Sequence, residues 1–302
     1  MNDEIVDVPS GVAATRPTPL PGDPVLRRLS LNQRTTANWT AEEAIEGAAR
    51  VGLRSVGLWR DPIAETGLDT VRHLLVEHDM RVSSICRGGF FTARDSAAFA
   101  RALAYNRAAI DEVEALEAGC LVLVPGGLPD GDRDITAARR RVVDAIGELA
   151  PYAAERGVVL AIEPMHPLFA ADRGVVSTLA QALDMAEGFD PSVVGVVVDT
   201  FHLWWEPDII SQIARASGRV ASYQICDWIT PFPSDALLSR GMMGDGHIDF
   251  AAITAAIAAT GYPGDVEVEI FNADVWAAPG DHVIATMARR YAELVAPYLE
   301  DQ

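Results

Sequence analysis

Polar side chains recur where four short apolar segments of the chain end. Glu163 lies in VVLAIEPMH, Asp199 in VGVVVDTFH, Gln224 in VASYQICDW and Glu269 in DVEVEIF. A lone acidic residue in such a place is usually a helix cap, but four residues at corresponding heights in consecutive segments point to one site. Three carboxylates and an amide oxygen repel one another unless a cation neutralises them, and hard divalent ions prefer oxygen ligands. The pattern therefore predicts a site for one divalent metal ion, Mn2+ or Mg2+, held by these four residues.

Each of these segments must be a strand that directs its polar residue towards a common pocket. Apolar runs alternate with longer stretches of helical periodicity, a pattern typical of βα units that build a parallel sheet. Strands are predicted over residues 28–33, 55–60, 81–88, 120–126, 158–166, 194–202, 220–228 and 265–271. Helices are predicted over residues 40–51, 95–118, 134–156, 177–187 and 281–298, and Thr40 with Glu43 forms a capping-box pattern at the start of the first.

Eight such units favour a closed (β/α)8 barrel, or TIM barrel, over an open sheet. No break in composition divides the units, and no G-x-G-x-x-G turn follows the first strand, which disfavours a dinucleotide-binding fold. Reactive groups of such barrels lie at the C-terminal ends of the strands. Residues two apart on a strand share a face, so Ala161, Val197 and Ser222 should form an inner layer below the predicted site. The long loop over residues 229–249 is the predicted lid.

The composition restricts the partners and the location of the protein. The 302 residues carry 24 basic and 43 acidic side chains, a net charge of −19, which argues against nucleic-acid or anionic-membrane partners. No run of about 18 apolar residues is present, so no membrane span is predicted. Residues 1–26 are predicted to form a flexible arm without the apolar segment of a signal peptide, followed by one catalytic domain over residues 27–302. Three scattered cysteines, Cys86, Cys120 and Cys226, predict reduced core thiols and a cytoplasmic location.

At these motifs the chain resembles the sugar phosphate isomerase/epimerase superfamily, the xylose isomerase-like TIM barrels. The resemblance extends from about residue 28 to the C-terminus, and EPMHP, VDTFH, RGMMGDGHID and EVEIF are its most specific pieces. It implies that Glu163, Asp199 and Glu269 bind the metal. It further implies that Glu163 and Glu269 act as the acid/base pair. His202 corresponds to a residue that contacts a substrate oxygen, and Arg240 to an arginine that binds a substrate hydroxyl or carbonyl.

The seventh predicted strand departs from the family pattern. Many relatives carry a histidine where this chain has Gln224, and an amide oxygen is a weaker and harder ligand than an imidazole. The difference predicts a lower metal affinity, or a preference for Mn2+ or Mg2+ over Zn2+.

Further residues near the predicted strand ends are expected to contact substrate. These are His166, Asp227, Trp228 and Arg87. Arg87 and Arg60 add positive charge to the mouth of the barrel, where an arginine can either bind substrate or balance the carboxylates.

The resemblance and the carboxylate pair predict an isomerase or epimerase that acts on a keto sugar or polyol-like substrate. Glu163 or Glu269 would remove a proton next to a carbonyl to give an enediolate. Return of a proton from the opposite face by the other carboxylate gives epimerisation, and return to the neighbouring carbon gives isomerisation. The same first step allows a metal-dependent lyase, either a dehydratase or a C-glycoside-cleaving subunit that acts on a 3-keto glycoside. A non-catalytic binding subunit is a third alternative, which the intact carboxylates disfavour.

The resemblance also bears on assembly. Homo-oligomers are common in the family, so a dimer or tetramer is predicted, or a hetero-oligomer if the chain is a lyase subunit. AP-endonuclease relatives share the barrel and use metals on DNA. The acidic balance of this chain disfavours that function, and so does its lack of additional His and Asp zinc ligands.

Overall fold

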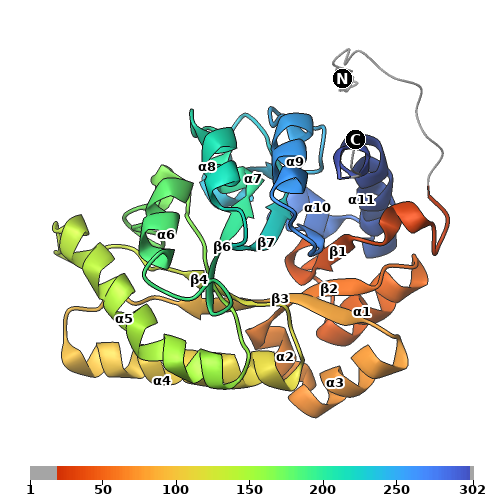
Figure 1. Cartoon of the computed structure of the whole chain (residues 1–302). Helices are drawn as coiled ribbons and strands as arrows, with labels where there is room; N and C mark the ends of the chain where they lie inside the picture. Colours follow the sequence, from red (N-terminus) through yellow and green to blue (C-terminus); the bar gives the residue numbers. More distant parts are fainter. Residues whose placement is uncertain (1–18, 300–302) are drawn as a thin grey trace.

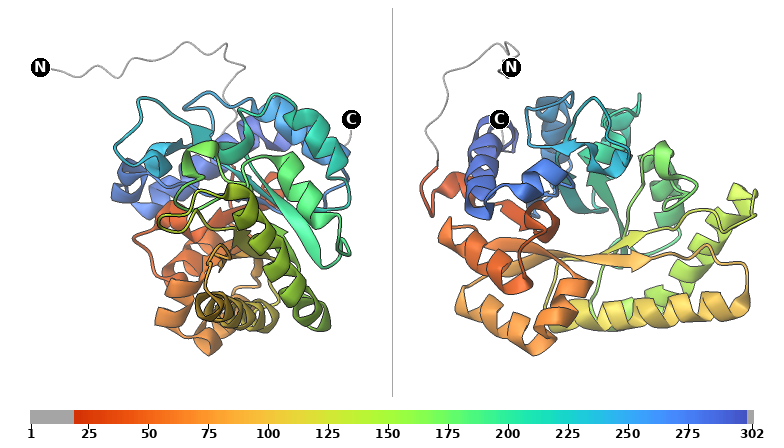
Figure 2. Two further views of the ribbon diagram at one scale, coloured as in Figure 1. Left: turned by 90° about the vertical axis from the view of Figure 1, so that its left-hand side faces the viewer. Right: turned by 180° about the vertical axis from the view of Figure 1, so that it is seen from behind.

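Eight short strands alternate with helices along the chain and close into one parallel barrel (Figures 1 and 2). The computed structural model describes residues 19–299. The strands are β1 Leu29–Asn32, β2 Ser55–Trp59, β3 Arg81–Gly89, β4 Leu121–Val124, β5 Leu160–Ile162, β6 Val194–Asp199, β7 Val220–Ile225 and β10 Val266–Val268. They are ordered β1-β10-β7-β6-β5-β4-β3-β2 around the barrel. The predicted (β/α)8 fold is therefore confirmed.

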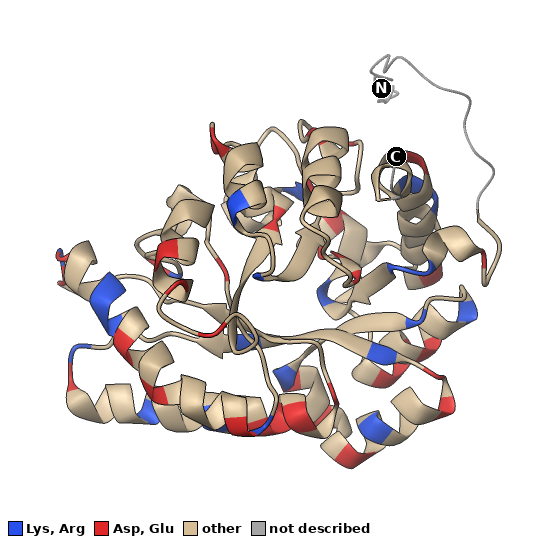
Figure 3. Ribbon diagram, viewed as in Figure 1, with Lys and Arg blue, Asp and Glu red and all other residues tan. Residues whose placement is uncertain are grey.

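Helices surround the barrel on its outer side (Figure 1). They are α1 Ala41–Arg50, α2 Arg60–Thr66, α3 Leu68–Glu77, α4 Ser96–Ala115, α5 Ile135–Glu155, α6 Leu179–Ala186, α7 Thr200–Leu203, α8 Ile209–Arg215, α9 Phe250–Ala259, α10 Ala273–Ala277 and α11 Gly280–Leu294. The predicted capping box is present: Glu43 N donates to Thr40 Oγ1 at 3.2 Å and Thr40 N donates to Glu43 Oε2 at 2.8 Å. Acidic and basic residues are distributed over these outer helices (Figure 3).

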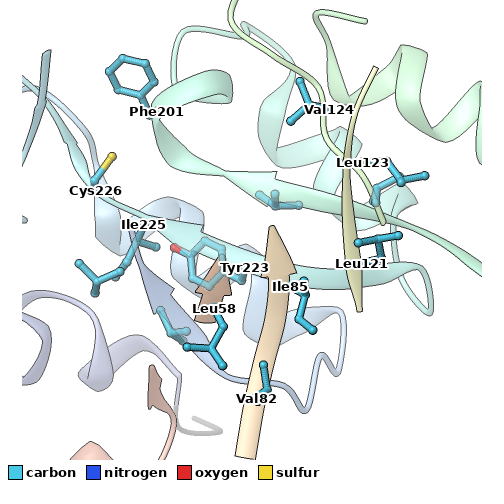
Figure 4. Packing of buried hydrophobic residues seen from close by; sticks show 14 of the residues in the cluster. Leu58, Val82, Ile85, Leu121, Leu123, Val124, Phe201, Tyr223, Ile225 and Cys226 are labelled. Carbon is cyan, nitrogen blue, oxygen red and sulfur yellow. The ribbon is translucent and has the colours of Figure 1, made fainter. Parts of the chain in front are cut away.

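The strands are buried on both faces, as a parallel barrel requires. Their outward side chains, among them Leu58, Ile85, Leu121 and Leu123, pack against the helices in one large apolar core (Figure 4). A second, smaller cluster fills the barrel and contains Cys86, Cys120, Val122, Ala161 and Val197. All three cysteines are buried and free, which agrees with the predicted core thiols.

Several predicted strands end earlier in the structure. β5 ends at Ile162 and β10 at Val268, so Glu163 and Glu269 follow directly after their strands. Beyond Asp199 the backbone leaves the sheet, because the Asp199 carboxylate accepts a hydrogen bond from Phe201 N at 2.7 Å and caps α7.

The seventh predicted strand is divided into two parts. β7 ends at Ile225, and β8 (Asp227–Trp228) pairs antiparallel with β9 (Arg240–Gly241) outside the barrel. This hairpin replaces the last three residues of the predicted strand.

The predicted N-terminal arm lies largely outside the described residues, which begin at residue 19. Pro24–Leu26 forms a 3-10 turn capped by the Asp23 side chain, and Leu26 is buried. The folded part of the chain therefore begins before the predicted boundary at residue 27. Within residues 19–299, none of the helices combines the length and apolar character needed to cross a membrane.

Candidate active site

A cavity of about 170 Å3 lies at the C-terminal ends of the strands, where the fold predicts reactive groups. Its size suits a small ligand, since an apolar cavity of about 150 Å3 accommodates benzene. The lining residues come from loops after most of the strands: Arg34, Trp59, Cys86, Arg87, Val124, Glu163, Met165, Arg173, His202, Leu237, Arg240, Glu269 and Phe271.

Two buried carboxylates contact one guanidinium at the base of this cavity. Arg240 Nη1 lies 3.0 Å from Asp199 Oδ2 and 3.0 Å from Glu269 Oε2. Arg240 itself is buried between the rings of Phe201 and Phe271, at 4.6 and 5.2 Å from the ring centroids. The structure thus brings Asp199, Glu269 and Arg240 together, with the arginine paired to the two carboxylates. Nη1 of Arg240 is the atom that forms both ion pairs.

The two glutamates at the cavity have perturbed acidities. Burial raises the pKa of Glu269 to about 8, against the opposing effect of the Arg240 charge. Burial and then repulsion from Glu269 and Asp199 raise the pKa of Glu163 well above its usual range. A carboxyl group with a pKa near neutrality can exchange a proton in either direction, which suits general acid–base chemistry.

His202 lies fully buried beside these carboxylates. Burial and the Arg240 charge hold its pKa well below its usual value, so the ring is neutral. His166 N donates to His202 Nδ1 at 3.0 Å, which assigns the ring proton to Nε2. Nε2 lies 3.9 Å from Glu163 Oε1, 3.7 Å from Asp199 Oδ2 and 3.1 Å from Arg240 Nη2. Two donors, His202 Nε2–H and Arg240 Nη2, therefore face each other at the cavity.

Gln224 is oriented by a carboxylate below the cavity. Its Nε2 donates to Glu267 Oε1 at 3.3 Å, while its buried Oε1 accepts no hydrogen bond. Glu267 is fully buried and also accepts from Ser83 Oγ at 2.5 Å and from Ser84 Oγ at 2.9 Å. With the amide nitrogen held by Glu267, the amide oxygen of Gln224 remains available to another partner.

Asn32 links this lower carboxylate to the cavity. Its Nδ2 donates to Glu267 Oε1 at 2.5 Å and to Glu269 Oε1 at 3.1 Å. Its Oδ1 accepts from Trp59 Nε1 at 3.0 Å and from Arg34 N at 2.9 Å. Sequence reasoning missed Asn32 and Arg34, although the polar run NQR directly after the apolar LSL of the first strand carried the same signal as the later strands.

Three residues expected to contact substrate have other partners. Asp227 is buried and accepts from the backbone N–H groups of Trp228, Gly244, Gly246 and Ile248, at 2.8 to 3.0 Å. Trp228 packs against the rings of Phe201 and His166, each with a centroid distance of 4.7 Å. His166 accepts from Leu168 N at 3.2 Å through Nδ1, and burial lowers its pKa to about 4.

None of these three side chains lines the cavity. For Asp227 and Trp228 the reason is the break after β7, which places them in β8 outside the barrel, whereas His166 follows the end of β5 at Ile162. Asp227 holds the loop from Gly244 to Ile248 in place. The rings of His166 and Trp228 pack against each other.

The two arginines singled out from the sequence differ in position. Arg60 forms a two-point ion pair with Glu112, at 2.6 and 2.8 Å, and does not line the cavity. Arg87 lines the cavity and stacks on Phe90, with its guanidinium carbon 4.5 Å from the ring centroid.

The donor set can hold a hard cation. Ligand atoms of Glu163, Asp199 and His202 lie within 4.8 Å of one another. His202 presents a proton at Nε2, which leaves the carboxylates and the free Gln224 Oε1 as the available ligands. Asp199 Oδ2 also accepts no hydrogen bond, although the Arg240 cation lies 3.0 Å away. Buried oxygens without hydrogen-bond partners are costly unless a positive charge compensates them.

Known proteins share this architecture. Inosose isomerase of Halalkalibacterium halodurans is 23% identical over 281 residues, which cover 90% of this chain and 97% of that protein. L-ribulose 3-epimerase of Methylomonas sp. is 24% identical over 257 residues, which cover 80% of this chain and 82% of that protein.

Among solved structures, protein SMc04130 from Sinorhizobium meliloti 1021 is 44% identical, with a TM-score of 0.87 over 89% of this chain and 99% of that chain. The IOLI protein, solved with a bound zinc atom, is 21% identical, with a TM-score of 0.79 over 91% of this chain and 100% of that chain. Residues 45–294 match the sequence profile of the xylose isomerase-like TIM barrels. The chain therefore belongs to the xylose isomerase-like TIM barrel family, within the sugar isomerase/epimerase superfamily.

Proposed function

We propose that the chain is a divalent-metal-dependent isomerase or epimerase that acts on a keto sugar or polyol-like substrate. The observation that carries the proposal is the pair of buried glutamates, Glu163 and Glu269, at one cavity. Burial raises the pKa of both carboxyl groups, that of Glu269 to about 8. They follow β5 and β10, which are separated by β6 and β7, and both line one small cavity. The relatives named inosose isomerase and L-ribulose 3-epimerase support the same reaction type.

Glu163, Asp199, Gln224 and Glu269 would hold the cation. The orphaned Gln224 Oε1 and Asp199 Oδ2 support this ligand set, and an all-oxygen set favours Mn2+ or Mg2+. When bound, the cation supplies stabilisation for the negative charge that develops on substrate oxygens during proton removal.

His202 and Arg240 would bind the substrate carbonyl. His202 Nε2–H and Arg240 Nη2 lie 3.1 Å apart. Both are hydrogen-bond donors, so neither can accept a hydrogen bond from the other. A substrate oxygen at this edge of the cavity can accept from both groups. Donors that are fixed before the substrate binds stabilise a developing oxyanion without a reorganisation cost.

The proton transfers belong to Glu163 and Glu269. One carboxylate removes the proton next to the carbonyl, and either carboxyl group returns it. Return from the opposite side gives epimerisation, while return to the neighbouring carbon gives isomerisation. Which glutamate acts first depends on the face of the substrate that each one meets.

Elimination is the second candidate reaction, because the same proton removal expels a leaving group in the β position. The volume of about 170 Å3 favours a small leaving group such as water over a large aglycone. Among the lyase alternatives, this observation favours a dehydratase over a C-glycoside-cleaving subunit. Oligomeric state and cytoplasmic location remain predictions.

Metal analysis of the purified protein tests the proposal first. We expect about one equivalent of divalent metal, a lower Tm after EDTA treatment and recovery on addition of Mn2+ or Mg2+. NMR in D2O with a panel of keto sugars should then show exchange of the hydrogen next to the carbonyl. A protein that takes up no divalent ion and exchanges no substrate hydrogen would contradict the proposal.

A further inference from the structure

The cavity contains more positive charge than its own carboxylates require. Glu163 and Glu269 are the acidic residues among those that line the cavity. Of the arginines that line it, Arg173 and Arg240 have carboxylate partners of their own. Arg34 and Arg87 also line the cavity and remain in excess. This excess lies within a chain of net charge −19, so it does not reflect a generally basic protein.

Neither excess arginine forms an ion pair with a protein carboxylate. Within residues 19–299, no carboxylate oxygen lies within 4.0 Å of the Arg34 or the Arg87 side-chain nitrogens. Arg173, a third arginine of the cavity, differs, because its Nε lies 3.0 Å from Asp172 Oδ2. Arg34 and Arg87 are both half-buried, and a half-buried guanidinium without a carboxylate partner is available to an anion.

Aromatic stacking holds both guanidinium groups at the cavity. The Arg34 guanidinium carbon lies 4.6 Å from the Trp59 ring centroid, and that of Arg87 lies 4.5 Å from the Phe90 ring centroid. Trp59 is fixed in turn by its hydrogen bond to Asn32. An arginine held by stacking keeps its N–H groups free, which lowers the entropy lost on binding an anion.

The positions of the two arginines allow them to act on one group. Arg34 follows β1 and Arg87 lies in β3, and these strands are the two neighbours of β2. Trp59, the last residue of β2, lies between them in the barrel order. Asn106 from α4 fixes the end of β3, since it donates to Gly89 O at 2.9 Å and accepts from Gly89 N at 2.7 Å.

A role as counter-ions for the glutamates explains these arginines less well. The Arg87 charge does lower the pKa of Glu163, and the Arg34 charge that of Glu269. Neither pair is in contact, however, whereas Arg240 is 3.0 Å from Glu269. The attraction between opposite charges weakens with distance, so an arginine that only neutralised a buried carboxylate would be expected to contact it.

We infer that the substrate is a compact keto polyol bearing a carboxylate, and that Arg34 and Arg87 bind this carboxylate. The inference rests on the proposed function for the keto-polyol part of the ligand. A carboxylate is favoured over a phosphate ester because the cavity measures about 170 Å3 and must also hold the reacting carbons. The acid group would lie over Trp59, across the cavity from the carboxylate cluster.

Binding of matched polyol pairs tests this inference. Calorimetry, with and without Mn2+, compares D-gluconate with D-glucitol and D-galactonate with D-galactitol, and D-glucitol 6-phosphate serves as the phosphate arm. For at least one pair we expect the wild-type protein to bind the acid about tenfold more tightly than its neutral partner. R34Q and R87Q should each reduce this preference about tenfold and leave binding of the neutral polyol within about twofold. R101Q, which removes an exposed arginine of α4, is the matched charge control and should keep the preference.

The outcomes separate this inference from the proposed function. Acids that bind no better than polyols, acids that do not bind, or a preference that persists in R34Q and R87Q would each overturn the inference. The last result would mean that the acid binds through the metal alone. A preference shown only by the phosphate ester would overturn the assignment to a carboxylate. Failure of the proposed function has a different signature, namely no uptake of Mn2+ by the wild-type protein while the acid preference persists without metal.

Discussion

The two halves of the barrel mouth carry opposite chemistry. At or directly after the ends of β5, β6, β7 and β10 lie Glu163, Asp199, Gln224 and Glu269, all buried. β1, β2 and β3 supply stacked arginines and an indole at the same cavity. The half with carboxylates can hold a cation and move protons, whereas the half with arginines can only bind. The difference teaches that one barrel mouth can bind the reacting carbons of a ligand on one side and the charged group that gives specificity on the other.

The largest expected effect comes from removing the proton-transfer groups of the carboxylate half. E163Q and E269Q keep side-chain shape but cannot exchange a proton, so each should lower the rate of hydrogen exchange in D2O by about 10^2 to 10^4-fold. NMR integration over time measures the rate. E148Q, an exposed glutamate of α5, is the control and should keep the wild-type rate. A wild-type rate of hydrogen exchange in both E163Q and E269Q would contradict the assignment of proton transfer to the carboxylate half.

Arg240 should be the main stabilising residue of the metal-free carboxylate half. R240M leaves Asp199 and Glu269 buried without their cation, which should cost about 3 to 5 kcal/mol of unfolding free energy in the EDTA-treated protein. Urea unfolding measures this loss, and Mn2+ should recover part of it. R60M is the matched control, because Arg60 is also ion-paired but lies outside the cavity. A loss in R240M that Mn2+ does not reduce at all would argue against a cation at this place.

Glu267 should influence metal binding without touching the metal. E267L removes the acceptor that fixes the Gln224 amide, and Q224L removes the proposed ligand itself. The first substitution should weaken Mn2+ binding by about 10 to 100-fold, the usual effect of an altered outer-shell partner, and Q224L should weaken it at least as much because it removes a ligand. Isothermal titration with Mn2+ measures the affinity, and circular dichroism checks the fold. If Q224L bound Mn2+ as tightly as wild type, Gln224 would be a spacer and the site would have three protein ligands.

The smallest expected effect is a pH dependence of stability that is specific to the metal-free protein. The folded state raises the pKa of Glu269 from 4.5 to about 8 and so holds a proton that the unfolded chain loses above pH 4.5. Stability from this group is full below pH 4.5 and is lost as the pH rises towards 8. The Tm of EDTA-treated protein should fall by about 5 °C over this range, less in E269Q and less with Mn2+. The same slope in all three samples would show that Glu269 does not cause it.

The sequence pattern predicted more residues of the carboxylate half than of the arginine half. Glu163, Asp199, Gln224 and Glu269 each close an apolar strand, and strand alternation puts them on the inner face of neighbouring strands. Register pairs Asp199 with Gln224, but it pairs Gln224 with Glu267 and not with Glu269. Periodicity could therefore predict the face on which these residues lie, but not the height of each one in the barrel.

The rest depended on where each strand ends, which periodicity does not show. Asp227 and His166 follow their strands at the right spacing, but the chain turns after Ile225 and after Ile162, so both side chains leave the cavity. Arg34 was missed because it lies in a short 3-10 turn after β1, where no regular pattern assigns a face. Tertiary contacts, such as the bond from Trp59 to Asn32, decide these positions.

The four hydrogen bonds to Asp227 determine how ligands can reach the cavity. They anchor the second part of the predicted lid, from Gly244 to Ile248, while the bond from Ile229 N to Ser239 O closes the base of an outer arch over residues 230–238. Leu237 of this arch lines the cavity, and Phe232 is exposed. In amide hydrogen exchange, Gly244, Gly246 and Ile248 should be protected nearly as strongly as the barrel, and the arch far less. We therefore expect that a ligand enters the cavity by movement of the arch and not of the segment from Gly244 to Ile248.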